Sequence, residues 1–325
     1  MKKEIVYFRA DGNSKIGYGH FFRCLALAEC IAERYNPVFL LHDSNEFVSQ
    51  QLRFRSIKSF HLKSDDPTLL ANEFLNHASK IVLDGYDFGT NYQTVIKNSG
   101  AHLVYIDDLH AWPILADVVV NHAPGIQAGA YTSITKSGTK FFLGLSYALI
   151  REHFIKNSAI IRSEKKIDRV LICMGGTDLR TEIEQIVSVL LKQPNLRQVT
   201  VITPFPIGPH NDSRVVVLAN QTGEGMAELM RSHQVIICPP STISIEAFYS
   251  RMCIALLQFA SNQQDILCGL LSYNNVASLG LASELTPAKL WGLQQVFSSW
   301  ESQSVLAQSF PLSFDRRNFL NIFES

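Results

Sequence analysis

Residues 4–28 read EIVYFRADGNSKIGYGHFFRCLALA and predict a strand, a glycine-rich loop and a helix in direct succession. The run Glu4–Arg9 is short and mostly apolar, as expected of a strand covered by helices on both faces. The glycine-rich loop follows, and the pattern over His20–Arg34 is helical. Repeated along a chain, this unit indicates an α/β fold with a parallel sheet.

The same unit recurs over the rest of the chain, which suggests two domains. Further strands are expected at Pro37–Leu41, Lys80–Asp84, His102–Asp107, Val118–Asn121, Arg169–Met174, Gln198–Thr203, Arg214–Leu218, Gln234–Cys238 and Cys253–Gln258. We expect two Rossmann-like, doubly wound domains over residues 1–156 and 167–325, joined by the polar segment 157–166. Open parallel sheets bind ligands at the carboxyl ends of their strands, so the active site is expected in the cleft between the domains.

The composition excludes several classes of protein. Of the 325 residues, 46% are hydrophobic, too many for a disordered chain, and 29 basic residues balance 29 acidic ones. That balance disfavours a nucleic-acid-binding protein. There is no apolar run long enough to span a membrane, and charged residues come too early for a signal peptide, so a soluble, cytoplasmic protein is expected. The six cysteines form no C-x-x-C pair and are expected in the core. No coiled-coil repeat or long apolar stripe stands out, and a monomer is expected.

The loop before the first helix holds the first candidate for catalysis. Gly17 and Gly19 resemble the start of a dinucleotide-binding motif, but Phe22 occupies the third glycine position of G-x-G-x-x-G. Its bulk would obstruct close packing of helix and strand, so NAD and FAD are disfavoured and no cofactor is expected. The loop instead places His20 near a helix N-terminus, where the positive end of the helix favours a neutral imidazole able to take a proton from water. A helix-capping or structural histidine is the alternative.

Acidic residues end two other strands of the first half. They are Asp84, followed by Gly85 and Tyr86, and the pair Asp107 and Asp108. No histidine or cysteine set has metal-ligand spacing near them, so no metal is expected. We expect Asp84 and Asp108 to orient a histidine, a substrate hydroxyl or a helix N-terminus.

The second half offers a candidate site for an anion. Gly175, Gly176 and Thr177 separate a strand from a helix, where exposed backbone N–H groups and the helix dipole suit a phosphate or diphosphate. A tight turn with Asp178 as N-cap is the alternative.

Two more strand-to-helix junctions carry polar residues. Ser241 and Thr242 can cap a helix and bind a phosphate, and Glu246, about one turn later, can accept two hydrogen bonds from a ribose diol. Asn262 and Gln263 lie in the polar run 261–265 and are expected to contact the substrate, whereas capping alone is the alternative for Asn262 and Asp265.

Seven segments together resemble the nucleotide-sugar hydrolases of pseudaminic acid biosynthesis. They are FRADGNSKIGYGHFFRCLALA (8–28), LDGYDFG (83–89), YIDD (105–108), GLSYALIREHF (144–154), ICMGGTDL (172–179), STISIEA (241–247) and SNQQD (261–265). The GYGH, SYALIRE and CMGGTD segments are specific, whereas the SxxxEA pattern is shared by many GT-B glycosyltransferases. The region after Asp265 is not aligned; it holds either the helix that crosses back to the first domain in GT-B proteins or an addition.

The resemblance implies a MurG-like GT-B fold with UDP held mainly by the C-terminal domain. It makes His20 the catalytic base and turns Tyr86 toward the reacting sugar. It assigns uridine-diphosphate contacts to Glu246, Asn262 and the backbone around Gly175, Gly176 and Ser241. Arg9, Asp11 and Arg23 match residues that flank the histidine. They are expected to contact the substrate, as are Gly17, Gly19, Asp84 and Asp108.

The implied enzyme is a nucleotide-sugar hydrolase of the EC 3.6.1 type. Water would attack the anomeric carbon of a UDP-linked 2,4-diacetamido-2,4,6-trideoxyhexose and release UDP with inversion. The alternatives are a GT-B glycosyltransferase with a UDP-sugar donor and a noncatalytic sugar-nucleotide-binding protein.

Overall fold

The structure, a computed structural model, describes residues 3–13, 15–160, 162, 166–208, 211–219, 221–305 and 314–324. The chain forms two compact units, Met1–Leu149 with Ser313–Ser325, and Ile150–Leu312. This division precedes residues 157–166, where the polar composition predicted a linker. Asn157 and Arg162 from that segment are buried in the second unit, where they bind backbone carbonyls of Ala227 and His233.

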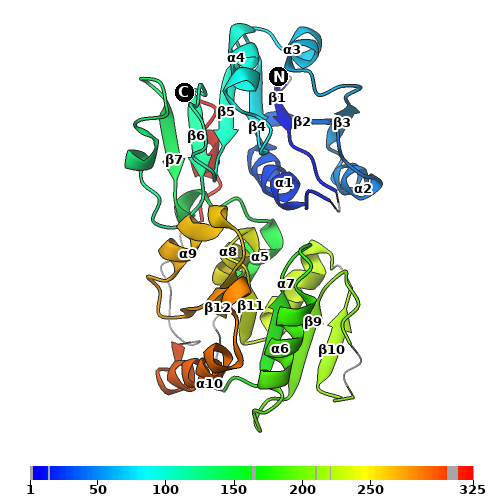
Figure 1. The fold of residues 1–325 in the computed structure, drawn as a ribbon. Coiled ribbons are helices and arrows are strands. Elements are labelled where there is room, and N and C mark those ends of the chain that lie inside the picture. The colour runs from blue at the N-terminus through cyan, green and yellow to red at the C-terminus, as the bar shows by residue number, and fades with distance from the viewer. Residues whose placement is uncertain are drawn as a thin grey trace. The chain divides into compact units, whose positions relative to one another are not determined.

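The first unit contains a seven-stranded parallel sheet with the order β3-β2-β1-β4-β5-β6-β7 (Figure 1). Its strands are β1 (Glu4–Arg9), β2 (Tyr35–Leu41), β3 (Lys58–His61), β4 (Lys80–Leu83), β5 (His102–Ile106), β6 (Val118–Asn121) and β7 (Lys140–Leu143). Its helices are α1 (Gly19–Ile31), α2 (Glu46–Phe54), α3 (Pro67–Phe74), α4 (Thr90–Asn98) and α11 (Arg317–Leu320), with 3-10 turns η1 (Ala128–Tyr131) and η2 (Leu145–Tyr147).

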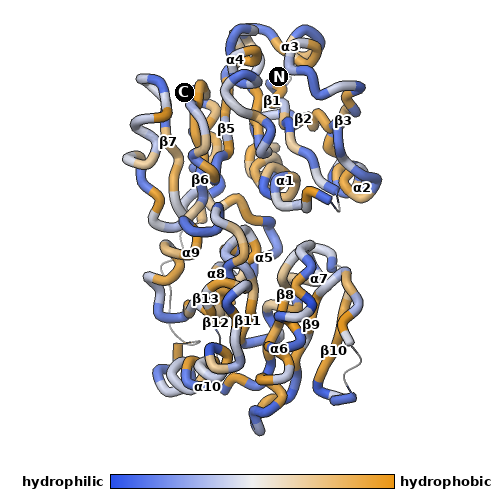
Figure 2. Tube along the Cα trace, in the orientation of Figure 1, coloured by the Kyte–Doolittle hydropathy of each residue, from blue (hydrophilic) through white to orange (hydrophobic). Residues whose placement is uncertain are grey.

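Helices cover both faces of this sheet. Along β4, Val82 joins a hydrophobic cluster with α1, whereas Ile81 and Leu83 join a second cluster with α3 and α4. Because successive side chains of a strand point to opposite faces, a sheet buried on both sides needs strands that are apolar throughout. Figure 2 shows this apolar character along the inner strands. Phe319 of α11 is fully buried in the α1 cluster, so the C-terminal segment completes the core of the first unit.

The second unit contains a six-stranded parallel sheet with the order β10-β9-β8-β11-β12-β13. Its strands are β8 (Arg169–Cys173), β9 (Gln198–Ile202), β10 (Val215–Leu218), β11 (Val235–Cys238), β12 (Cys253–Gln258) and β13 (Val276–Leu281). Its helices are α5 (Glu152–Ser158), α6 (Arg180–Leu190), α7 (Gly223–Ser232), α8 (Thr242–Tyr249), α9 (Gln264–Leu270) and α10 (Pro287–Ser302), with 3-10 turns η3 (Ser261–Gln263) and η4 (Ala282–Glu284).

The expected strands are all present, and the structure adds β3, β7 and β13. All three lie at sheet edges, where fewer positions need to be apolar. One smaller expectation was wrong: Cys268 is exposed, whereas the other five cysteines are buried. Within the described residues, none of the helices combines the length and the hydropathy that a membrane crossing requires.

Candidate active site

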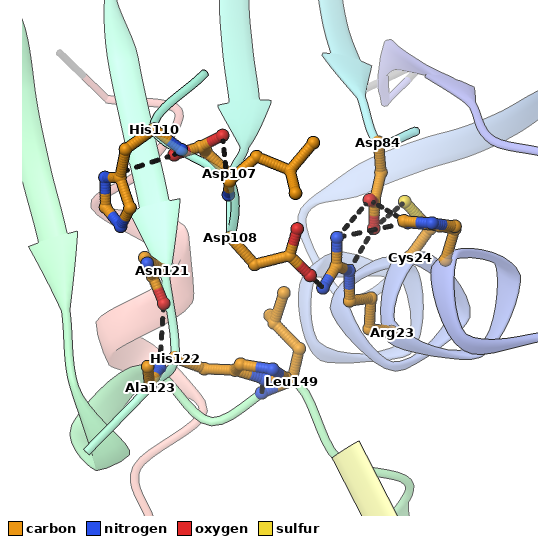
Figure 3. Close-up of polar contacts among 12 residues, drawn as sticks. Arg23, Cys24, Asp84, Asp107, Asp108, His110, Asn121, His122, Ala123 and Leu149 are labelled. Carbon is orange, nitrogen blue, oxygen red and sulfur yellow. Dashed lines mark hydrogen bonds and ion pairs between the residues drawn. The ribbon is translucent and has the colours of Figure 1, made fainter. Parts of the chain in front are cut away.

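His20 lies one residue into α1 and contacts the carboxyl end of β4. Its Nδ1 is 2.7 Å from an oxygen of Asp84, the first residue after that strand. Arg23, one turn further along α1, binds the same carboxylate through Nε (2.6 Å) and Nη2 (2.5 Å), and Asp108 through Nη1 (2.8 Å). Figure 3 shows Arg23 between the two carboxylates. The structure thus joins four of the predicted residues: His20, Arg23, Asp84 and Asp108.

This geometry selects one tautomer of His20. An ionised carboxylate only accepts hydrogen bonds, so the proton of a neutral His20 resides on Nδ1 and is donated to Asp84. Nη2 of Arg23 lies 3.1 Å from the same Nδ1, but two donors cannot bond to each other. The lone pair of a neutral His20 is therefore on Nε2, which is the arrangement required of a general base.

Asp84 is ionised in this cluster although it is fully buried. Burial alone would raise the pKa of its carboxyl group. The positive charge of Arg23 and the hydrogen bonds from Arg23 and His20 outweigh that effect and lower the pKa to about 2. The thiol of Cys24 also points to Asp84, at 3.6 Å. Asp84 is therefore a fixed negative charge behind the imidazole.

Tyr86 follows Asp84 by two residues and contacts His20 with its ring. The two ring centroids are 4.5 Å apart and the rings are nearly perpendicular, at 87°. Tyr86 is 47% exposed, so part of its side chain faces solvent beside the imidazole. The predicted pair of histidine and tyrosine is thus assembled from α1 and the β4–α4 loop.

The glycine-rich loop reaches His20 through a tight turn. Asn13 and Gly17 exchange two backbone hydrogen bonds, of 3.2 and 2.9 Å, and Gly17 has a φ of +83°. A side chain would be strained at that φ. Gly19 begins α1, and a Cβ placed there would meet no atom within 4 Å. The loop therefore leaves space around the helix terminus that carries His20.

Arg9 and Asp11 form a separate network. Arg9 is 1% exposed and bonds to Asp11 (2.5 Å) and to Asp65 (2.6 and 3.0 Å). Asp11 also accepts hydrogen bonds from the backbone of His42 and the hydroxyl of Ser44, both at 2.8 Å. These contacts tie the end of β1 to the loops after β2 and β3. They favour a structural role for both residues over the expected contact with substrate.

In the second unit, the Gly175 loop follows β8 as expected. Gly175 has a φ of +70°, and a Cβ at Gly175 or Gly176 would meet no atom within 4 Å. Both glycines and Thr177 are exposed. The alternative in which Asp178 caps α6 was wrong, because Leu179 is the N-cap and Asp178 pairs with Arg180 at 2.8 Å. The loop keeps an open, exposed backbone suited to an anion.

Ser241 and Thr242 lie at the start of α8, after β11. Ser241 is the N-cap residue, and its backbone N–H donates to the hydroxyl of Ser244 at 3.1 Å. Thr242 is the first helical residue, and both predicted residues are partly exposed. Their position fits the expected phosphate contacts at a helix N-terminus.

Glu246 lies in α8 and is almost fully buried. Both of its carboxylate oxygens accept hydrogen bonds from Arg151, through Nε and Nη2, each at 2.8 Å. Arg151 belongs to the SYALIRE segment, but the sequence predicted no role for it. The two residues are 95 positions apart, so only the tertiary fold reveals the pair.

Asn262 and Gln263 lie in η3, between β12 and α9. The side-chain oxygen of Gln263 accepts N–H bonds from Phe259 (2.9 Å) and Ala260 (3.3 Å). The side chain of Gln263 therefore stabilises its own turn, an arrangement that the sequence did not predict. Asn262 is partly exposed and lies at the same strand-to-helix junction.

A further residue behind the His20 cluster had no expected role. His122 is 2% exposed, and its Nδ1 accepts a hydrogen bond from the backbone of Leu149 at 3.2 Å (Figure 3). Burial, and next the nearby charge of Arg23, lower the pKa of His122 to about 4, so it is neutral. Within the described part of the chain, no group of three or more His, Cys, Asp or Glu residues could hold a metal ion.

Comparison with known proteins gives two sequence relatives, and no protein-family model matches the chain. The chain is 27% identical over 278 residues to the UDP-2,4-diacetamido-2,4,6-trideoxy-beta-L-altropyranose hydrolase of Campylobacter jejuni, covering 80% of this chain and 93% of that protein. It is 23% identical over 278 residues to an uncharacterized protein of Methanocaldococcus jannaschii, covering 79% of this chain and 55% of that protein. The chain thus spans about half the length of the archaeal relative.

Solved structures with a similar fold are more distant in sequence. MurG of Acinetobacter baumannii has a TM-score of 0.61 at 12% identity, covering 99% of both chains. A putative UDP-N-acetylglucosamine 2-epimerase from Listeria monocytogenes has a TM-score of 0.62 at 9% identity, covering 99% of this chain and 95% of that one. Arabidopsis thaliana UGT89C1 has a TM-score of 0.65 at 9% identity, covering 99% and 94%. The chain therefore has the GT-B fold.

Proposed function

We propose that the protein is a hydrolase that releases UDP from a UDP-linked 2,4-diacetamido-2,4,6-trideoxyhexose in pseudaminic acid biosynthesis. The observation that carries the proposal is the 2.7 Å bond between His20 Nδ1 and Asp84, which leaves Nε2 as the basic nitrogen. The 27% identity to a hydrolase of such a nucleotide sugar supports the choice of substrate.

In the proposed reaction, His20 activates water. Nε2 takes a proton from the water as the oxygen bonds to the anomeric carbon. The bond from that carbon to the diphosphate oxygen breaks, and its electron pair leaves with UDP. A single displacement of this kind inverts the anomeric configuration. Tyr86, against the imidazole, orients the water or the sugar, and Asp84 stabilises the imidazolium that forms.

The second unit is proposed to bind UDP. The N–H groups of Gly175, Gly176 and Thr177 and the start of α8 at Ser241 and Thr242 disperse the charge of the diphosphate. Glu246 is assigned to the ribose and Asn262 to the remaining contacts of the nucleotide. The first unit acts on the sugar in this proposal.

The test is turnover of UDP-linked amino sugars in the absence of any acceptor. We expect free sugar and UDP in equal amounts, with the 2,4-diacetamido-2,4,6-trideoxy sugar processed fastest in the panel. Release of UDP only after an acceptor is added would identify a glycosyltransferase instead. Binding of UDP without turnover of any member would identify a noncatalytic binding protein.

A further inference from the structure

The pair formed by Arg151 and Glu246 is a two-point contact between rigid, planar groups. Nε donates to one carboxylate oxygen and Nη2 to the other, each at 2.8 Å. The side chain of Glu246 is 4% exposed and that of Arg151 is 12% exposed. Bidentate bonding of this kind fixes the plane of the carboxylate as well as its charge, which a lysine could not do.

The surroundings hold the guanidinium group in that orientation. Arg151 directly precedes α5, and its guanidinium group lies over the ring of Phe154. The distance from Cζ of Arg151 to the centroid of that ring is 4.8 Å. A Cβ at Gly223 would lie 3.1 Å from Nη1 of Arg151, so glycine leaves room there for the guanidinium group. Phe154 thus packs against the guanidinium group, and the absence of a side chain at Gly223 leaves space beside it.

The pair lies near the glycine loop that is proposed to bind the diphosphate. Burial raises the pKa of the Cys173 thiol to about 11, and the charges of Glu246 and Arg151 also act on it. Cys173 is the last residue of β8, two positions before Gly175. The carboxylate of Glu246 is thus within electrostatic range of the strand end that carries the glycine loop.

We infer that Arg151 is a positioning residue that sets the orientation of Glu246 for the ribose hydroxyls of UDP. A carboxylate offers about four acceptor positions, and Arg151 uses one on each oxygen. The second position on each oxygen then has a fixed direction and can accept one hydroxyl. The inference rests on UDP binding in the proposed function, but not on water being the nucleophile.

The test compares UDP with 2′-deoxy-UDP by calorimetry. For the wild-type protein we expect UDP to bind about tenfold more tightly or better, because a hydroxyl bonded to a charged acceptor is lost in the deoxy nucleotide. Arg151→Lys retains a positive charge without the planar fork, and this preference should fall to within about twofold. Glu246→Gln should lose the preference too. The double variant Arg151→Lys/Glu246→Gln should lose no more of the preference for UDP than either single variant, because both residues act through one contact.

Arg231→Met is the matched control. Arg231 pairs with Glu228 on the surface of α7, where both side chains are about half exposed. This variant should keep the wild-type preference. Arg151→Met removes the positive charge and leaves the buried carboxylate of Glu246 without this partner, which destabilises the fold. It is therefore compared with the double variant Arg151→Met/Glu246→Gln, in which the buried negative charge is also removed.

The outcomes separate this inference from the proposed function. A wild-type preference for UDP that persists in Arg151→Lys overturns the inference, because charge alone would then suffice. Absence of UDP binding to the wild-type protein overturns the proposed function and the inference with it. UDP binding with a preference lost in Arg151→Lys supports the inference even if no sugar is hydrolysed.

Discussion

Replacing Asp84 by asparagine perturbs the contact on which the proposed base depends. One oxygen of Asp84 accepts hydrogen bonds from His20 and from Nη2 of Arg23, and the other accepts one from Nε of Arg23. Asparagine places an oxygen and an NH2 group in the same positions. If the NH2 group faces His20, the imidazole must carry its proton on Nε2 and loses its basic nitrogen. If the NH2 group faces Nε of Arg23, two donors oppose each other.

The loss of stability follows from the pKa of Asp84. Burial raises that pKa, but Arg23 and His20 outweigh it and lower it from 3.8 to about 2. This difference corresponds to about 2 kcal/mol of unfolding free energy at neutral pH. Because the folded pKa is the lower one, this contribution is present above the unfolded pKa and is lost as the pH falls from about 4 to 2. We expect Asp84→Asn to lose about 2 kcal/mol and to lower kcat about 10²–10⁴-fold.

The assay pairs urea unfolding with the rate of UDP release, and Asp117→Asn is the control. Burial raises the pKa of Asp117, but hydrogen bonds from Lys136 and Lys97 outweigh it and also lower the pKa to about 2. Asp117 directly precedes β6, whereas Asp84 directly follows β4. Because the strands are parallel, the two residues lie at opposite ends of the strands. Its replacement should reduce stability and leave kcat unchanged. Wild-type kcat and an unchanged pH–rate profile in Asp84→Asn would show that the base does not depend on Asp84.

Three further predictions concern the base, the diphosphate loop and pH. His20→Asn should lower kcat about 10²–10⁴-fold while the Kd for UDP by calorimetry changes less than twofold; an equal loss of UDP affinity would make His20 a binding residue. Gly175→Ala should lower the unfolding free energy by about 1 kcal/mol because of its φ of +70°, whereas Gly176→Ala should not. Both substitutions should weaken UDP binding in the same calorimetric titration. Between pH 6.5 and 4, His122 binds a proton in the unfolded chain but not in the folded protein, because its folded pKa is lowered to about 4. Urea unfolding should therefore give a free energy of unfolding up to about 3 kcal/mol lower at pH 4 than at pH 6.5. His122→Gln should flatten that slope.

Most of the fold could be predicted from the sequence because buried parallel strands are continuous apolar runs. Val118–Asn121 and Cys253–Gln258 match the observed strands residue for residue. The edge strands did not give this signal. Lys58–His61 has the sequence KSFH and no buried residue, and its strand character arises from pairing with β2, which local sequence does not encode.

The candidate site was predictable where it depended on strand ends. Asp84 and Asp108 follow the neighbouring parallel strands β4 and β5, and His20 lies in the helix after β1. The topology therefore brings all three residues to the carboxyl ends of the strands. Partners from distant positions could not be predicted. Arg151 reaches Glu246 only through the tertiary fold, and Arg9 pairs with Asp65, 56 residues away, as well as with Asp11.

Turnover in ¹⁸O-labelled water shows whether water is the nucleophile and which bond it cleaves. The proposed attack on the anomeric carbon predicts one ¹⁸O atom in each released sugar, none in UDP, and a first-formed sugar of inverted anomeric configuration by NMR. His20→Asn should slow this labelling by the same factor as UDP release. Label found in the phosphate of the nucleotide product would show attack at phosphorus, and no labelled sugar until an acceptor is supplied would show that water is not the nucleophile.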